Sequence, residues 1–154
     1  MKRTWIRQAL IVNEGICFAG SVVIENEIIS EVLHGDECPS LPCDEEIDAH
    51  GCYLIPGVID DHVHFRDPGL THKADMVTET AAAAAGGVTS FMDMPNCNPQ
   101  TTTLDALEQK FTDAASKCIV NYSFYFGATN NNVHLLQELD KTKVCGIKLF
   151  MGAS

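Results

Sequence analysis

The sequence predicts an α/β protein in which a small antiparallel sheet precedes the first part of a parallel sheet with helical crossovers. In the first third, short β-branched runs are broken by turn signals. From residue 53 onward, short apolar runs alternate with longer helix-like segments. This change divides the chain into a sheet segment, residues 1–52, and an α/β segment, residues 53–154.

The sheet segment consists of short strands joined by hairpin turns. In residues 4–33 the β-branched runs are separated by Asn-Glu-Gly, Ala-Gly and Glu-Asn-Glu, which are hairpin signals. Residues 34–51 are polar and rich in proline and acidic side chains, and we expect them to form a connector.

The α/β segment alternates four strands with three helices. We expect strands at "YLIPGVIDDHVHF", "VTSFMDMP", "NYSFYFGA" and "VCGIKLFMG", and helices at "THKADMVTETAAAAAGG", "TTTLDALEQKFTDAASKC" and "NNNVHLLQELDKTK". This order is typical of a parallel sheet. It fits the first half of a (β/α)8 barrel, which needs about 250 residues. A doubly wound sheet would suit the length, but its G-x-G-x-x-G turn is absent.

Charge and composition narrow the classes of partner. The formal net charge of −11 argues against a nucleic-acid binder, which needs a basic face. No apolar run is long enough to span a membrane, and the start carries no secretory signal. The seven cysteines contain no C-x-x-C pair, which favours free thiols in a reducing cytoplasm.

Two histidines at the end of the first predicted strand of the α/β segment are candidate metal ligands. Side chains alternate across a strand, so His62 and His64 share a face and lie about 6–7 Å apart along it. Asp60 has the same parity and could orient a histidine ring. Arg66 continues the parity before an Asp-Pro-Gly turn, and its guanidinium suits a carboxylate. Taken alone, each residue also fits a structural role.

Two further residues extend the candidate site. Asn96 follows the second predicted strand, at the edge where (β/α)8 barrels carry their catalytic residues. Lys148 points inward from the fourth, where a bare ammonium is costly. It could form a carbamate with CO₂, a Schiff base or an ion pair, and the carbamate is favoured only if the lysine lies beside the histidines.

Three stretches in this order resemble the cyclic amidohydrolases, and most closely dihydroorotase. They are "PGVIDDHVHFRDPGLTHK", "AAAAAGGVTSFMDMPN" and "GIKLFMGAS", and the resemblance runs from about residue 5 to the end. It implies the N-terminal part of a TIM-like (β/α)8 metallo-hydrolase barrel, preceded by part of a β-sandwich.

The resemblance also implies roles for the candidate residues. His62 and His64 match the ligands of the more buried zinc. Lys148 matches the carboxylated lysine that bridges two Zn²⁺ ions. Arg66 and Asn96 match the residues that hold the carboxylate of dihydroorotate. The implied reaction is metal-assisted hydrolysis of dihydroorotate to N-carbamoyl-aspartate, a step of pyrimidine biosynthesis, in a cytoplasmic enzyme that is a homo-oligomer at full length.

Other members of this group remain as alternatives. Allantoinases, dihydropyrimidinases and hydantoinases act on rings without a carboxylate, which leaves Arg66 without a partner and makes dihydroorotase the favoured function. A non-catalytic relative would be expected to lose metal ligands, whereas His62, His64 and Lys148 are all present. The resemblance places two more histidines and a general-base aspartate beyond residue 154, so we expect residues 1–154 alone to be inactive and their open sheet edges to promote self-association.

Overall fold

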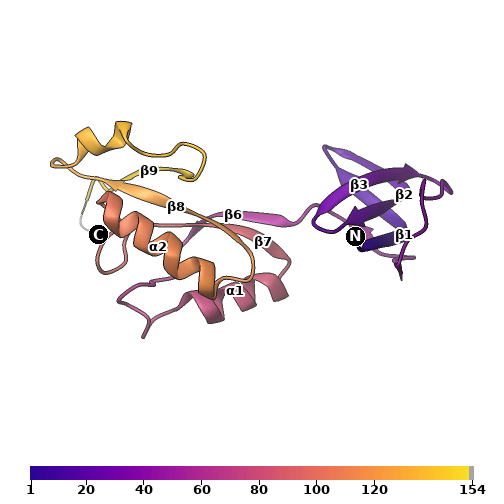
Figure 1. The fold of residues 1–154 in the computed structure, drawn as a ribbon, viewed down its shortest axis with the longest axis horizontal. Coiled ribbons are helices and arrows are strands. Elements are labelled where there is room, and N and C mark those ends of the chain that lie inside the picture. The colour runs from indigo at the N-terminus through magenta and orange to yellow at the C-terminus, as the bar shows by residue number, and fades with distance from the viewer. Residues whose placement is uncertain (153–154) are drawn as a thin grey trace. The chain divides into compact units, whose positions relative to one another are not determined.

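The computed structural model describes residues 1–152 (Figure 1). They form two compact units, Met1–Pro56 and the part of the chain from Gly57 onward. Each unit has its own sheet and its own buried apolar cluster.

The first unit is a five-stranded sheet. Its strands are β1 (Arg3–Asn13), β2 (Ile16–Glu25), β3 (Ile28–His34), β4 (Glu45–Asp48) and β5 (Tyr53–Leu54). The predicted antiparallel hairpins are confirmed for β1, β2 and β3. The connector prediction is wrong in part, because β4 adds to β1 in parallel. The first two residues of the predicted strand at 53–65 also pair with β1 rather than with the second sheet.

The second unit is a four-stranded parallel sheet, as the alternation predicted. It contains β6 (Val58–Val63), α1 (Met76–Ala85), β7 (Val88–Asp93), α2 (Leu104–Lys117), β8 (Asn121–Ala128), the 3₁₀ helix η1 (Val133–Gln137) and β9 (Gly146–Leu149). The strand order β6-β7-β8-β9 follows the chain, and every neighbouring pair is parallel. This is the arrangement of half a (β/α)8 barrel.

Local side-chain chemistry explains where the two α-helices begin. The carboxylate of Asp75 accepts hydrogen bonds from the backbone N–H groups of Val77 and Thr78 and so caps α1. These bonds, chiefly the one from the Thr78 backbone, lower the pKa of Asp75. The Thr103 hydroxyl accepts from the Ala106 N–H and caps α2, within the threonine cluster where the sequence predicted a helix start.

The third predicted helix, residues 130–143, is wrong: only the short 3₁₀ helix η1 forms there. The Asn132 side chain donates to the carbonyls of Thr102 and Gly127, and accepts from the Thr129 N–H. These bonds tie the segment to the end of β8 and compete with an α-helical start. Leu139 still reaches the core, so the apolar pattern that suggested a helix reflects burial.

The core of the second unit lies between the sheet and the two α-helices. Figure 1 shows α1 and α2 along the strands, and the cluster joins side chains from both helices to the aromatic residues of β7 and β8. Phe91, Phe124 and Phe126 are at most 1% exposed. No helix within residues 1–152 has the length and apolar character needed to cross a membrane.

One ion pair is completely enclosed in this core. The Lys110 ammonium of α2 lies 2.7 Å from the Asp93 carboxylate at the end of β7, and the two side chains are 0% and 1% exposed. The ammonium also lies 4.8 Å from the ring centre of Phe124 and donates to the Met94 carbonyl at 3.3 Å. The carboxylate in turn accepts from the Phe65 N–H at 2.9 Å. These contacts compensate for the cost of burying both charges.

We predict that Lys110→Met lowers the free energy of unfolding by about 3–5 kcal/mol, because it leaves the Asp93 carboxylate buried without its cation. Denaturant titration of the variant and the unmodified chain measures the difference. Adding Asp93→Asn to Lys110→Met should recover much of the loss, since the amide keeps an acceptor for the Phe65 N–H without a charge. An equal loss in the single and double variants would contradict this.

Candidate metal and substrate site

His62 and His64 lie at the carboxyl end of β6, on the face of the sheet that the helices leave open. Both are exposed, whereas Val63 and Phe65, which alternate with them, pack against or within the core. The two imidazole ring centres are 5.3 Å apart and the rings are tilted by 53°. The predicted shared face is therefore present.

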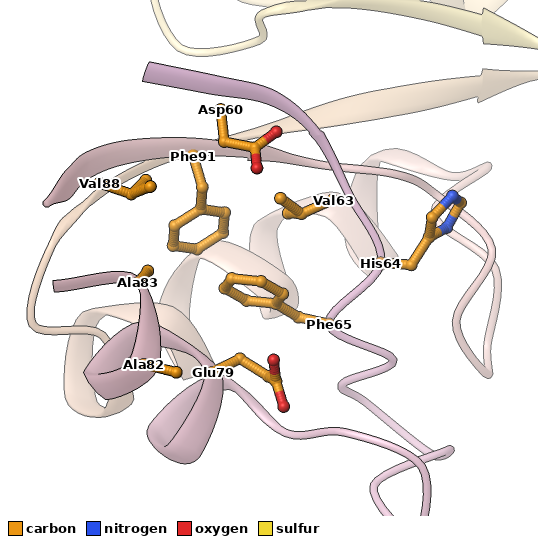
Figure 2. A pocket seen from close by; sticks show the side chains of 9 residues that line it. All are labelled: Asp60, Val63, His64, Phe65, Glu79, Ala82, Ala83, Val88 and Phe91. Carbon is orange, nitrogen blue, oxygen red and sulfur yellow. The ribbon is translucent and has the colours of Figure 1, made fainter. Parts of the chain in front are cut away.

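Asp60 does not share that face, so the predicted contact with a histidine ring is wrong. A register shift between Asp60 and Val63 shows that β6 carries an extra residue there, and Asp60 pairs with Phe91 on the helix side. In Figure 2 its carboxylate lies beside Val63 and Phe91 in a cavity of about 320 Å³, while the His64 ring points away from it. The Asp60 carboxylate accepts from the His62 backbone N–H at 3.1 Å and so holds the bulge.

Asn96 joins His64 at the ends of β6 and β7. Its side-chain oxygen lies 2.8 Å from Nδ1 of His64. An amide oxygen can only accept, so with the amide in this orientation Nδ1 carries the proton and Nε2 has a free lone pair. That is the tautomer in which Nε2 can bind a metal ion, with the orientation fixed by an outer partner.

Arg66 also meets Asn96. Its guanidinium Nη1 donates to the Asn96 backbone carbonyl at 3.4 Å, and the side chain is half-buried. The backbone of Arg66 has φ of +61°, so the strand alternation that predicted its direction ends one residue earlier. The structure nevertheless brings Arg66, Asn96 and His64 together through the hydrogen bonds given above.

Lys148 lies on β9, the strand farthest from β6 in the sheet order. It pairs with Gly127 and is half-buried, and its Nζ lies 5.4 Å from the ring centre of Phe150. Within residues 1–152 the structure shows no contact between Lys148 and the histidines. The last two residues of the "GIKLFMGAS" stretch, Ala153 and Ser154, lie outside the described residues.

Tyr125 on β8 is a site residue that the sequence did not predict. Its hydroxyl donates at 3.0 Å to the carbonyl of Asp61, which precedes His62 in the bulge. The bond crosses β7 on the open face and ties β8 to β6. Burial raises the pKa of Tyr125, so the phenol stays protonated and donating at neutral pH.

The geometry of the two histidines fits one metal ion. Two imidazoles bound to one zinc ion at about 2.0–2.1 Å, with a tetrahedral angle between them, have ring centres about 5 Å apart. The observed 5.3 Å and the free Nε2 of His64 both meet this requirement. Within residues 1–152, no group of three or more His, Cys, Asp or Glu side chains lies together as a metal site.

A parallel half-barrel with paired histidines at the carboxyl edge of its first strand is consistent with a TIM-barrel metallo-hydrolase. Residues 51–143 match the family model described as Dihydro-orotase-like. The chain belongs to the dihydro-orotase-like family.

Relatives in this family carry different names. The chain is 38% identical over 146 residues to an allantoinase of Streptomyces avermitilis, covering 94% of this chain and 32% of the relative. It is 39% identical over 134 residues to a dihydroorotase of Methanosarcina acetivorans, covering 86% and 28%. The structure matches the L-hydantoinase (dihydropyrimidinase) from Arthrobacter aurescens with a TM-score of 0.92 and 26% identity, covering 100% of this chain and 34% of that one. The chain thus spans about a third or less of these relatives.

We predict that His64 is protonated at Nδ1 when the ring is neutral, because Asn96 accepts from that nitrogen. ¹⁵N-resolved NMR of the imidazoles at about pH 8, above the usual histidine pKa, distinguishes the two tautomers. Asn96→Ala should shift His64 toward the Nε2-protonated form. His134, which is exposed, serves as the internal control. A His64 ring protonated at Nε2 in the unmodified chain would refute the assignment.

Proposed function

We propose that the protein containing this chain is a zinc-dependent dihydroorotase, which interconverts dihydroorotate and N-carbamoyl-aspartate in pyrimidine biosynthesis. The observation that carries the proposal is the contact of Arg66 with Asn96 beside His64, at the carboxyl edge of the parallel sheet. A guanidinium at that position selects a cyclic amide that carries a carboxylate.

The chemistry of the substrate explains why an arginine is needed. Dihydroorotate carries an acid group on a ring carbon that a single CH2 group separates from the amide carbonyl that is hydrolysed. The planar guanidinium of Arg66 can donate two parallel hydrogen bonds to that carboxylate and also neutralise its charge. The Asn96 amide nitrogen is available as a second donor, because the amide oxygen is occupied by His64. Together they would fix the ring so that its amide carbonyl faces the histidines.

His62 and His64 would hold one of two zinc ions in this proposal. Zinc would supply Lewis-acid polarisation of the amide carbonyl and lower the pKa of a water molecule. Lys148 would complete the site as N6-carboxylysine, whose two carbamate oxygens could bridge two ions. The position of Lys148, a half-buried residue on the open face, is the support for this role. The remaining ligands and the general-base aspartate would come from outside residues 1–154.

We also propose how the two units fit into the whole protein. We propose that the second unit, from Gly57 onward, is the first half of the barrel and that the first unit, Met1–Pro56, is part of a sandwich. The apolar side chains exposed on the two edge strands, among them Ile59 of β6 and Leu149 of β9, support further strands or a partner along both edges. A cytoplasmic homo-oligomer is the expected state.

Allantoinase is the second candidate function. The support for it is the allantoinase relative, whose match covers 94% of this chain. Allantoin has no carboxylate, so in that case Arg66 would have no acid group to bind. Dihydropyrimidinase and hydantoinase activities are further candidates, supported by the structural match to the L-hydantoinase. A non-catalytic role would be shown by the absence of turnover with every one of these substrates.

We predict that the zinc-loaded whole protein opens dihydroorotate, and that Arg66→Gln lowers kcat/KM for it by about thirtyfold. This corresponds to the loss of about 2 kcal/mol from hydrogen bonds to a charged group. Hydrolysis of allantoin and hydantoin, measured alongside, should be slow and insensitive to the substitution.

Arg7→Gln is the matched control, because Arg7 belongs to the first unit and its ion pairs within residues 1–152 are with Glu46 and Asp48 of the same unit. It should leave kcat/KM unchanged. Faster turnover of allantoin than of dihydroorotate, unaffected by Arg66→Gln, would favour the allantoinase function instead.

A further inference from the structure

Arg66 has a backbone conformation that its own residue type does not favour. Its φ of +61° lies in the left-handed region, where an L side chain is crowded. Residues held this way persist only where the surrounding structure imposes the conformation, and they concentrate at functional sites. The contacts on both sides of Arg66 therefore show what imposes this conformation.

An aspartate controls the chain on each side of Arg66. Before it, the Phe65 N–H donates at 2.9 Å to the Asp93 carboxylate at the end of β7. After it, Asp67 is only 3% exposed, and its carboxylate accepts from the Met76 N–H at 3.3 Å. The backbone of Arg66 is thus enclosed between two anchored positions.

Both aspartates are held by lysines of one helix. Lys110 pairs with Asp93 at 2.7 Å. Lys117 donates to both oxygens of Asp67, at 3.0 and 2.9 Å. The hydrogen bond to Asp67 raises the pKa of Lys117, so the lysine is cationic throughout the physiological range. Seven positions separate the two lysines in α2, which is about two helical turns, so they project from the same face.

The positions of these pairs argue against a role in stability alone. The enclosed Lys110–Asp93 pair is of a kind that is seldom better for stability than apolar side chains of similar size. Lys117 is 33% exposed, and an ion pair that water reaches adds little stability. Each of these pairs instead meets the chain next to a candidate site residue. Lys110 also donates to the carbonyl of Met94, two residues before Asn96. One helix therefore contacts both segments that present the proposed carboxylate-binding groups.

We propose that Lys110 and Lys117 are positioning residues that, through Asp93 and Asp67, set Arg66 in the conformation that binds the carboxylate of a cyclic amide substrate. The inference rests on the proposed function for the identity of the substrate, while the control of the Arg66 backbone stands on the contacts themselves. Neither lysine touches the substrate.

Lys117→Met is the practical variant, because Lys117 is 33% exposed and its loss is tolerated more easily than that of the enclosed Lys110. In the whole protein we expect the KM for dihydroorotate to rise about tenfold, while kcat changes less than about twofold. Loss of a residue that orients a binding group typically costs about 10–100-fold, and tenfold is the lower end of that range. Lys117→Arg should restore the KM. Lys141→Met, at an exposed lysine outside α2, should leave both parameters unchanged.

The structure of the Lys117→Met variant gives a readout that does not depend on the substrate. We expect Arg66 to leave the left-handed region in that variant and to keep it in Lys117→Arg. An unchanged φ at Arg66 in Lys117→Met would overturn the proposal. So would a tenfold fall of kcat with no rise in KM. If the unmodified protein does not open dihydroorotate, the proposed function fails, and the φ of Arg66 alone decides the positioning role.

Discussion

The buried pair of Lys110 and Asp93 is the interaction on which the rest of the second unit depends. It places a full positive and a full negative charge where water does not reach, so each group must keep its partners. Asp93 uses its other oxygen on the chain after β6, and Lys110 also contacts the loop after β7. One pair therefore joins a helix to the ends of two strands.

One face of the parallel sheet forms the core, and the other face carries the candidate site residues. Phe91 and Phe124 lie on the helix side and form the core. His62, His64, Tyr125 and Lys148 lie on the open side, because neighbouring residues of a strand point in opposite directions. Parallel strands end at a common edge, so residues far apart in the sequence are presented at one edge without a long loop.

Much of this arrangement follows from sequence pattern. Alternation along the strand predicts the common face of His62 and His64, and the order of strands and helices predicts the parallel sheet. The alternation does not predict side-chain direction where one extra residue or one unusual backbone angle turns the following part of the strand. The bulge turns Asp60 to the helix side, and the left-handed backbone redirects the chain at Arg66. The Asn132 bonds prevent the third helix in the same local way.

The roles of the α2 lysines could not be predicted from the sequence. A lysine within an amphipathic helix normally lies on a solvated face, and nothing near Lys110 in the chain shows that it meets Asp93. The contact between Lys110 and Asp93 is a tertiary contact, because it depends on how α2 packs on β7 and β8. Tyr125 is a similar case, since its acceptor is a backbone carbonyl on a strand that is not its neighbour.

We propose that these strand ends form a zinc site beside which Arg66 and Asn96 orient the carboxylate of dihydroorotate. A crystal structure of the whole protein with zinc and dihydroorotate, with anomalous data at the zinc edge, tests it most directly. We expect zinc about 2.0–2.1 Å from a nitrogen of His62 and of His64, carboxylated Lys148 between two ions, and the substrate acid group on Arg66. Zinc bound elsewhere, or a substrate carboxylate turned away from Arg66, would contradict the account.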